Sequence, residues 1–306
     1  MRQIGPVLLF IILCGMASSW RTAIPEEKAS PQVYLNHFYL ILDSSTYKDV
    51  VESDFIKNEF APFEERTTVV NNNESYSGAY IYGENTYFEF FDESKSQSFM
   101  PSGLTSGMAF GVEKKDELKI IQKKLKDYKN AFYALRTREF EGAQIPWFSM
   151  TGVFYGETAP DIMTWVMEYH EDFLKKWHPD LAPSSPGITR KDILTRYAAK
   201  IAQPEQPRAK LLKDVIEIYL DLKQENFEIF NGELSVFGYE FSAKDDKKIC
   251  IGPGIKFIIE IINEGQGKIN GIKMSLHPHK HKEETLAFGE KSRLILHADN
   301  TATWLF

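Results

Sequence analysis

The alternation of polar and apolar side chains predicts a β-strand over residues 34–42. Successive side chains of a strand point to opposite faces, so His37 and Tyr39 would share one face, and Phe38 and Leu40 the other. A helix over residues 46–55 is expected next, because Asp43-Ser44-Ser45 offers an N-cap in front of it. Turn residues then separate three further strands, expected at residues 67–70, 77–82 and 86–91.

The same order of elements recurs in the next part of the chain. A short apolar strand at residues 108–112 precedes a helix that Asp116 would cap and that would run to about residue 126. Three more strands are expected at residues 132–140, 147–154 and 163–170. The pattern therefore predicts two copies of one strand–helix–three-strand unit, with little sequence identity between them.

Beyond this repeat, the pattern changes to a connector and then to a β-rich part. Residues 177–207 are helical in pattern and interrupted by proline, and they include a helix over residues 189–201 with Thr189 as its cap. Further strands are predicted at residues 215–222, 234–241, 255–262 and 269–276, followed by a closing hairpin over residues 286–306. Trp304 makes this last hairpin apolar enough to be packed into the fold.

Composition and charge exclude several classes of protein. Hydrophobic residues make up 43% of the chain, enough for a core, which excludes a disordered or fibrous protein. The 36 basic residues against 43 acidic ones give a net charge of -7, which would repel a phosphate backbone. We therefore expect no nucleic-acid partner.

Residues 1–19 have the pattern of a secretory signal peptide: Arg2 precedes an apolar run, and small residues precede Trp20. The run is shorter than the roughly 20 residues that a transmembrane helix needs, so no transmembrane segment is expected. The sequence thus predicts an exported protein, periplasmic or extracellular. Lipoprotein anchoring through Cys14 is the less favoured alternative, because the bulky Leu13 precedes it.

The repeated unit, with His37 on its first strand and Glu89 on its last, resembles the glyoxalase or vicinal-oxygen-chelate superfamily. More narrowly, residues 34–39, 82–91, 288–292 and 302–304 are similar to a family of secreted bacterial proteins with a glyoxalase-like core and no assigned function. The resemblance implies an α+β fold in which paired βαβββ modules form a cupped mixed sheet over residues 32–172. A helical connector over residues 173–212 and a β-rich C-terminal module over residues 213–306 would follow.

In the superfamily, a divalent metal is held by ligands from the first and last strands of each unit. Carried over to this sequence, the resemblance offers His37, Glu89 and Glu168 as ligands for zinc, manganese or iron, whereas residues 108–112 offer none. One histidine with two carboxylates also matches the ligand types of a facial triad. Independently of the resemblance, a carboxylate within an apolar strand needs a partner, because burying it alone is costly. A solvated strand face is the alternative.

Glu168 and four further side chains are candidates for chemistry or binding. Glu168 and His170 would carry acid–base catalysis, although a histidine at a strand end is often merely exposed. Tyr39, Tyr87 and Arg138 would contact a small-molecule ligand, the alternatives being core packing for the tyrosines and surface pairing for the arginine. Arginine within Glu64-Glu65-Arg66 or Arg136-Thr137-Arg138 would suit a carboxylate or phosphate if it faced the cup.

Other motifs in the sequence are weaker evidence for a function. The segment His277-Pro278-His279-Lys280-His281 could bind a metal, but its lysines and proline favour a solvated loop. Hydrolase, kinase and dehydrogenase motifs are missing from the sequence. The leading hypothesis is a secreted protein that handles a small molecule, with metal-dependent lyase, isomerase or dioxygenase chemistry. The alternatives are a non-catalytic binding protein and a structural extracellular module, and the sequence leaves the oligomeric state open.

Overall fold

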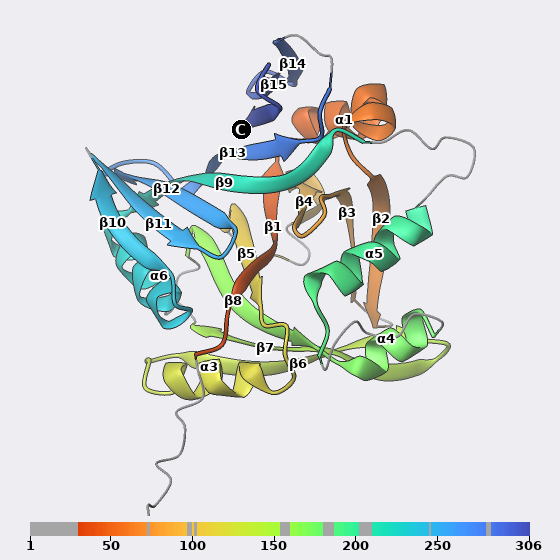
Figure 1. Ribbon diagram of the computed structural model, residues 1–306, viewed down its shortest axis with the longest axis vertical. Coiled ribbons are helices and arrows are strands. Elements are labelled where there is room, and N and C mark those ends of the chain that lie inside the picture. Colours follow the sequence, from red (N-terminus) through yellow and green to blue (C-terminus); the bar gives the residue numbers. More distant parts are fainter. Residues whose placement is uncertain are drawn as a thin grey trace, which may run out of the picture.

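The structure, a computed structural model, describes residues 30–71, 74–96, 100, 103–153, 160–179, 187–201, 210–244, 246–279 and 283–306. Within these residues the strands form two eight-stranded sheets (Figure 1). The N-terminal sheet has the order β2 (Phe63–Asn71), β3 (Glu74–Tyr82), β4 (Tyr87–Asp92), β1 (Tyr34–Leu42), β5 (Ser106–Gly111), β8 (Ile162–Tyr169), β7 (Ala143–Val153) and β6 (Ala131–Phe140). The C-terminal sheet has the order β10 (Glu240–Lys244), β11 (Lys247–Gly252), β12 (Ile255–Ile262), β9 (Leu212–Lys223), β13 (Lys268–Leu276), β16 (Thr301–Leu305), β15 (Ser292–Leu296) and β14 (Glu284–Phe288).

Two βαβββ units build the N-terminal sheet, which confirms the predicted fold class. The first is β1, α1 (Ser44–Glu52), β2, β3 and β4, and the second is β5, α3 (Glu117–Leu125), β6, β7 and β8. In each unit the first strand pairs in parallel with the last, and β1 and β5 join the units in antiparallel pairing. The edge strands β2 and β6 approach each other, so the sheet curls into a cup.

The C-terminal sheet repeats this construction. Strand β9, helix α6 (Gln224–Val236) and strands β10, β11 and β12 follow one another in the chain, and β9 pairs in parallel with β12, as in the N-terminal units. The last four strands follow the same order in space, but no helix is described between β13 and β14, and β13 pairs antiparallel with β16. In the N-terminal units a helix runs back along the sheet after the first strand, so the second strand runs in the same direction as the first. Without such a helix β14 runs opposite to β13, and after two further reversals β16 does so too.

One predicted strand is wrong. Residues 234–241 were expected to be extended, but α6 includes the first three of them, and β10 begins only at Glu240. Phe230, Leu234 and Phe237 recur at helical spacing and are all buried, so one helical face packs on the core. The alternating pattern that suggested a strand covers only a few residues, whereas the buried helical face extends over several turns, so the helix is favoured.

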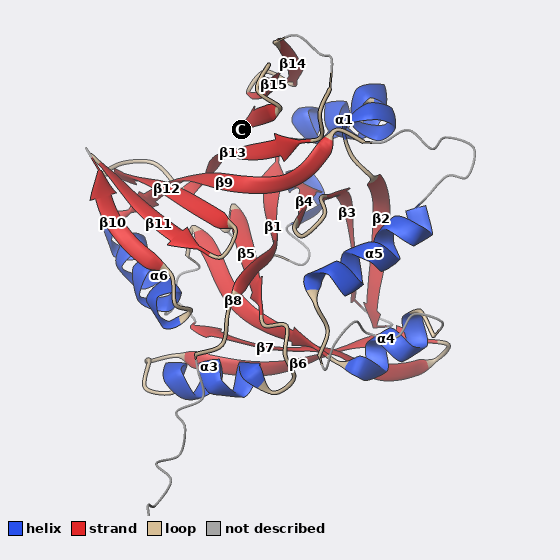
Figure 2. Ribbon diagram, viewed as in Figure 1, coloured by secondary structure: helices blue, strands red, loops and turns tan. Residues whose placement is uncertain are grey.

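The remaining described helices lie beside the N-terminal sheet. They are the π-helical turn η1 (Ile56–Phe60), α2 (Glu93–Ser96), α4 (Glu171–Trp177) and α5 (Arg190–Ile201). The predicted cap of α5 is confirmed, because the amide of Asp192 donates to the Thr189 hydroxyl and the Asp192 carboxylate accepts from the Thr189 amide. Figure 2 shows α5 lying alongside β2 and β3.

The core lies where the helix-side faces of the two sheets meet. Trp304 on β16 is fully buried, with its ring centroid 5.2 Å from that of Phe90 and 6.1 Å from that of Phe88, both on β4. Its indole N–H donates to the Ser292 hydroxyl at 2.8 Å. The prediction that the end of the chain is packed into the fold is therefore confirmed. His37 and Glu89, which lie on the opposite face of their strands, point away from this core into the cup.

We expect Trp304→Ala to lower the free energy of unfolding by about 3–5 kcal/mol, because it removes a large buried ring from between the sheets. Leu305→Ala is the matched control, since the neighbouring Leu305 is 40% exposed, and it should cost less than about 1 kcal/mol. Urea unfolding followed by circular dichroism measures both. Equal losses for the two variants would contradict this packing.

Candidate functional site

His37 and Glu89 face each other inside the cup. They are carried by the parallel strands β1 and β4, in which Tyr39 pairs with Glu89 and His37 pairs with Tyr87. His37 Nε2 lies 3.9 Å from Glu89 Oε1, and the two side chains are only 12% and 10% exposed. The sequence-predicted pair is thus brought together and is largely withdrawn from water.

The orientation of the His37 ring is set by its neighbour Asn36. The pairing of β1 with β5 shifts register between Leu35 and His37, so a β-bulge lies at Asn36. Asn36 Oδ1 then lies 2.9 Å from His37 Nδ1. Because an amide oxygen only accepts, Nδ1 carries the proton, and the lone pair of Nε2 is directed toward Glu89.

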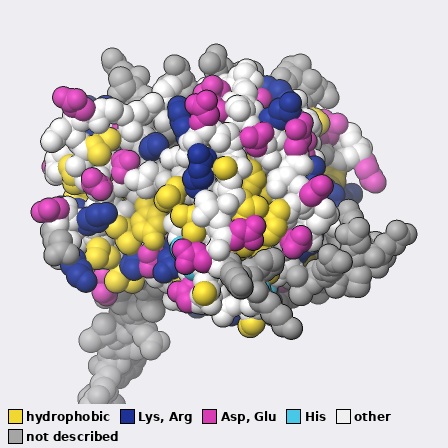
Figure 3. Space-filling view, turned by 90° about the horizontal axis from the view of Figure 1, so that it is seen from above, with side chains coloured by type: hydrophobic (Ala, Val, Ile, Leu, Met, Phe, Trp, Pro, Cys, Tyr) yellow, Lys and Arg dark blue, Asp and Glu magenta, His cyan; other side chains and the backbone are white. Residues whose placement is uncertain are grey.

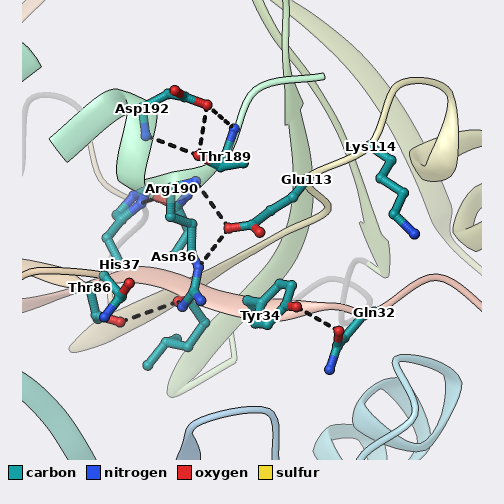
Figure 4. Close-up of polar contacts among 12 residues, drawn as sticks. Gln32, Tyr34, Asn36, His37, Thr86, Glu113, Lys114, Thr189, Arg190 and Asp192 are labelled. Atoms are coloured by element: carbon teal, nitrogen blue, oxygen red, sulfur yellow. Dashed lines mark hydrogen bonds and ion pairs between the residues drawn. The ribbon is translucent and has the colours of Figure 1, made fainter. Parts of the chain in front are cut away.

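Arg190, at the start of α5, secures the bulge. Its Nη1 donates to the carbonyl of Leu35 at 2.9 Å, and its Nε donates to Glu113 at 3.1 Å (Figure 4). The guanidinium also lies 4.3 Å above the centroid of the Tyr34 ring. Through these contacts α5 is attached to β1 directly beside His37.

Aromatic rings form the wall around the pair. The His37 ring stacks on Tyr87 with centroids 4.6 Å apart and meets Trp165 edge-on at 5.8 Å. Tyr39 packs against Trp165 and lies over β5, where a Cβ at Gly107 would come within 2.5 Å of its ring. A glycine at that position is what leaves room for the tyrosine.

Two hydrogen-bond donors of this wall lack an acceptor. Tyr39 Oη and Trp165 Nε1 are buried, and neither has a hydrogen-bond partner among the described residues. A buried donor without a partner costs about 1–3 kcal/mol. The wall therefore holds unused hydrogen-bonding capacity next to the His37–Glu89 pair.

Burial pushes both members of the pair toward their neutral forms. Desolvation raises the pKa of Glu89 to about 7, and the charge of Arg66 and a hydrogen bond from Tyr87 only partly oppose it. Desolvation lowers the pKa of His37 to about 3. Burial, and then the nearby Glu89, raise the pKa of Tyr39 far above its usual value, so its hydroxyl remains a donor. Between about pH 3 and pH 7 the cup thus holds a neutral imidazole and a protonated carboxyl.

Glu168 is not brought to this pair. It lies on the opposite face of β8, where its carboxylate accepts from the backbone N–H groups of Asp116 and Leu118, each at 2.9 Å. It therefore caps α3, a role that the sequence had assigned to Asp116, whose side chain makes no capping bond. The face of β8 opposite to Glu168 contributes Trp165 to the cup, together with Met167 and Tyr169. Sequence reasoning missed Trp165.

His170 and Arg138 also lie apart from the pair. His170 Nε2 is 2.9 Å from the hydroxyl of Ser149, which is the strand partner of Glu168 on that opposite face. The guanidinium of Arg138 lies 5.3 Å from the Trp147 ring and 5.6 Å from the Phe140 ring. Of the predicted site residues, the structure thus gathers His37, Glu89, Tyr39 and Tyr87.

The other predicted features lie elsewhere. His277 faces Glu84 at 3.2 Å, and His281 lies outside the described residues, as do residues 1–19 with Cys14. Cys250 is buried in the core. A hollow of about 270 Å³ beside Glu168 is lined mainly by charged side chains, including Lys115, Glu171, Asp172 and Lys175.

The sequence profile of a family of unknown function, DUF5829, matches residues 35–306. The chain belongs to this family. A search of curated proteins found no match. Among solved structures, a hypothetical protein from Staphylococcus aureus is similar over 83% of this DUF5829 chain and 95% of its own length, with a TM-score of 0.47 and 10% sequence identity. A variant of homoprotocatechuate 2,3-dioxygenase from B. fuscum is similar over 90% of this chain and 72% of its own length, with a TM-score of 0.41 and 8% identity.

In this DUF5829 protein, the donor set that the described residues offer does not fit a resident metal ion. A catalytic metal site uses about three protein ligands, and His37 and Glu89 supply two. Across the described ranges, no group of three histidine, cysteine, aspartate or glutamate side chains is placed to hold a metal. In the same residues, no helix has the length and apolar character to cross a membrane.

We expect Glu168→Ala to lower the free energy of unfolding by about 1 kcal/mol, because two N–H groups at the start of α3 lose their acceptor. Asp116→Gly is the control: the Asp116 backbone has a φ of 68°, which glycine adopts freely, so this change should cost nothing. Urea unfolding compares them. A larger loss in Asp116→Gly would restore the cap predicted from the sequence.

The neutral pair predicts a specific pH dependence of stability. Glu89 has a raised pKa, so its contribution to the free energy of unfolding is full below pH 4.5 and is lost as the pH rises to about 7. His37 has a lowered pKa, so its contribution is full above pH 6.5 and is lost as the pH falls toward 3. Between pH 4.5 and 6.5 the two slopes, each about 1.4 kcal/mol per pH unit, nearly cancel.

Single substitutions should separate these slopes. Relative to the wild type, Glu89→Gln should become more stable as the pH rises from 4.5 to 6.5, and His37→Gln should become less stable. Thermal unfolding in a pH series measures both. Profiles that run parallel to that of the wild type would show that the two groups are not held neutral.

Proposed function

We propose that the cup of the N-terminal sheet binds a small, planar, hydroxyl-bearing molecule, and that it does so without a metal ion. The observation that carries this is the placement of two buried, partnerless donors, Tyr39 Oη and Trp165 Nε1, beside the His37–Glu89 pair. The protein then belongs among binding proteins, the class that the sequence offered as the alternative to a metal enzyme.

The hydrogen-bonding groups of the cup complement a hydroxyl group. The lone pair of His37 Nε2 and the oxygens of Glu89 accept a hydrogen bond, whereas Tyr39 and Trp165 donate one. A hydroxyl both donates and accepts, so one such group can satisfy members of both sets. Satisfying a buried donor recovers part of the 1–3 kcal/mol that its burial costs.

The rings of the cup complement a flat ligand. Tyr87 and Trp165 present a ring face and a ring edge around His37, and a planar ring can stack or pack edge-on against such surfaces. A neutral pair favours an uncharged hydroxyl at this point, because no charge has to be desolvated with it. We also propose that the protein is exported, which the pattern of residues 1–19 supports.

Phenol tests this proposal as the simplest planar hydroxyl compound, with cyclohexanol as the non-planar comparison. We expect calorimetric titration to show saturable phenol binding and weaker binding of cyclohexanol. Tyr39→Phe should weaken phenol binding about tenfold, because one hydrogen bond of about 1.4 kcal/mol is lost. The same variant should keep or gain stability without phenol, since it removes a buried donor that has no acceptor.

Tyr133→Phe is the matched control, because Tyr133 is 52% exposed and its hydroxyl bonds to Ser149 outside the cup. It should bind phenol as the wild type does. Absence of phenol binding, or equal effects of the two tyrosine variants, would contradict the proposal. So would a stoichiometric metal that survives dialysis of the wild type and is lost from His37→Ala.

A further inference from the structure

Arg66 lies within the cup, in contact with two aromatic rings. It is on β2, paired with Gly78 of β3, and its guanidinium carbon lies 4.0 Å from the centroid of the Tyr80 ring. The ring centroid of Tyr197 on α5 lies 4.9 Å from the same carbon. The side chain is only 13% exposed. The ring contacts hold the guanidinium in a narrow slot formed by the sheet and α5.

One nitrogen of this guanidinium is occupied and another is not. Nη1 donates to Glu64 Oε1 at 2.6 Å and to the hydroxyl of Tyr82 at 3.4 Å. Nε, in contrast, is buried and has no acceptor among the described residues. Nε and Nη2 together form the edge that pairs with a carboxylate through two parallel hydrogen bonds.

The charges around Arg66 leave room for one more anion. Glu64 is shared between Arg66 and Lys200 of α5, whose Nζ lies 3.5 Å from Glu64 Oε2. Two cations therefore face one carboxylate. This local excess of positive charge contrasts with the net charge of -7 of the whole chain.

We propose that Arg66 binds a carboxylate group of the cup's ligand through its Nε and Nη2 edge. This inference rests on the proposed function and adds the chemical class of the ligand: a planar hydroxyl compound that also carries a carboxylate. Glu89 and Arg66 lie on strands separated only by β3, or roughly 10 Å across the sheet. Tyr80 of β3 is the strand partner of Glu89 and lies between them, so an aromatic ligand that bridges the two ends of the cup would lie over the Tyr80 ring.

The geometry of the slot favours a carboxylate over a phosphate. The guanidinium carbon lies over the rings of Tyr80 and Tyr197, which limit the directions from which an anion can approach. A carboxylate is planar and lies in the plane of the guanidinium with both oxygens engaged. A tetrahedral phosphate places an oxygen above or below that plane and so needs more room beside the two rings.

Paired probes that differ only in charge test this inference. We expect 4-hydroxybenzoate to bind at least tenfold more tightly than 4-hydroxybenzamide in calorimetric titrations of the wild-type protein at pH 6, where the probe is ionised and Glu89 is largely protonated. Arg66→Gln should remove this preference, and Arg66→Lys should restore only a small part of it, because a lysine lacks the two-point edge. Hydroquinone monophosphate should bind more weakly than 4-hydroxybenzoate.

Arg293→Gln is the matched control, because it removes the same charge from β15 of the other sheet, and it should leave the preference unchanged. Equal affinity of the acid and the amide for the wild type would overturn the inference even if Arg66→Gln failed to fold. A tighter phosphate would overturn the choice of carboxylate. If phenol binds but the acid has no advantage, the proposed function stands alone; if neither phenol nor these probes bind, both fail.

Discussion

The packing of the two helix-side sheet faces against each other is the constraint on which the rest of the structure depends. Trp304 lies at its centre, surrounded by rings from β4 and from the end of the chain. Once one face of each strand is committed to this core, the other face must line a cup. Figure 3 shows the molecule from above, where apolar patches lie among charged side chains on the outside. His37 and Glu89 are in the cup because Phe38 and Phe88, their neighbours on the strands, are in the core.

The same parity explains how much of the site the sequence could predict. The repeat and the first strand follow from local alternation, whereas the combination of His37 with Glu89 came from the resemblance of the repeated unit to a known superfamily. Alternation does not show whether Trp165 or Glu168 faces the cup. Both lie within an apolar strand but on its opposite faces, and only the orientation of β8 decides which face is turned to the cup. This orientation is set by the register of β8 with β5, in which Ala109 pairs with Trp165. The sequence alone does not reveal such a register. The helix α6 was missed for a related reason: its buried face is visible only once it is known what packs on it.

Two buried glutamates show how structural and functional carboxylates differ in this fold. Glu233 of α6 is fully buried where α6 meets β7 and β8, and it accepts from the backbone of Val153 and from the Thr164 hydroxyl. Its burial is compensated by donors that the fold itself supplies. Glu89 faces a histidine whose Nε2 carries no proton, and burial raises its pKa to about 7. Donors in its surroundings also lack acceptors, so the cup, unlike the α6 contact, is left with hydrogen bonds to be made by something else.

Helix α5 connects the two ends of the proposed ligand site. Its first residue, Arg190, holds the carbonyl of Leu35 beside the bulge that orients His37. Its Tyr197 covers Arg66, and Lys200 shares the Glu64 carboxylate with that arginine. A displacement of α5 would therefore release the ring orientation at one end of the cup and open the guanidinium slot at the other. Because both ends depend on one helix, a ligand that bridges the cup would also stabilise the position of α5, and the segment predicted from the sequence as a connector becomes a wall of the site.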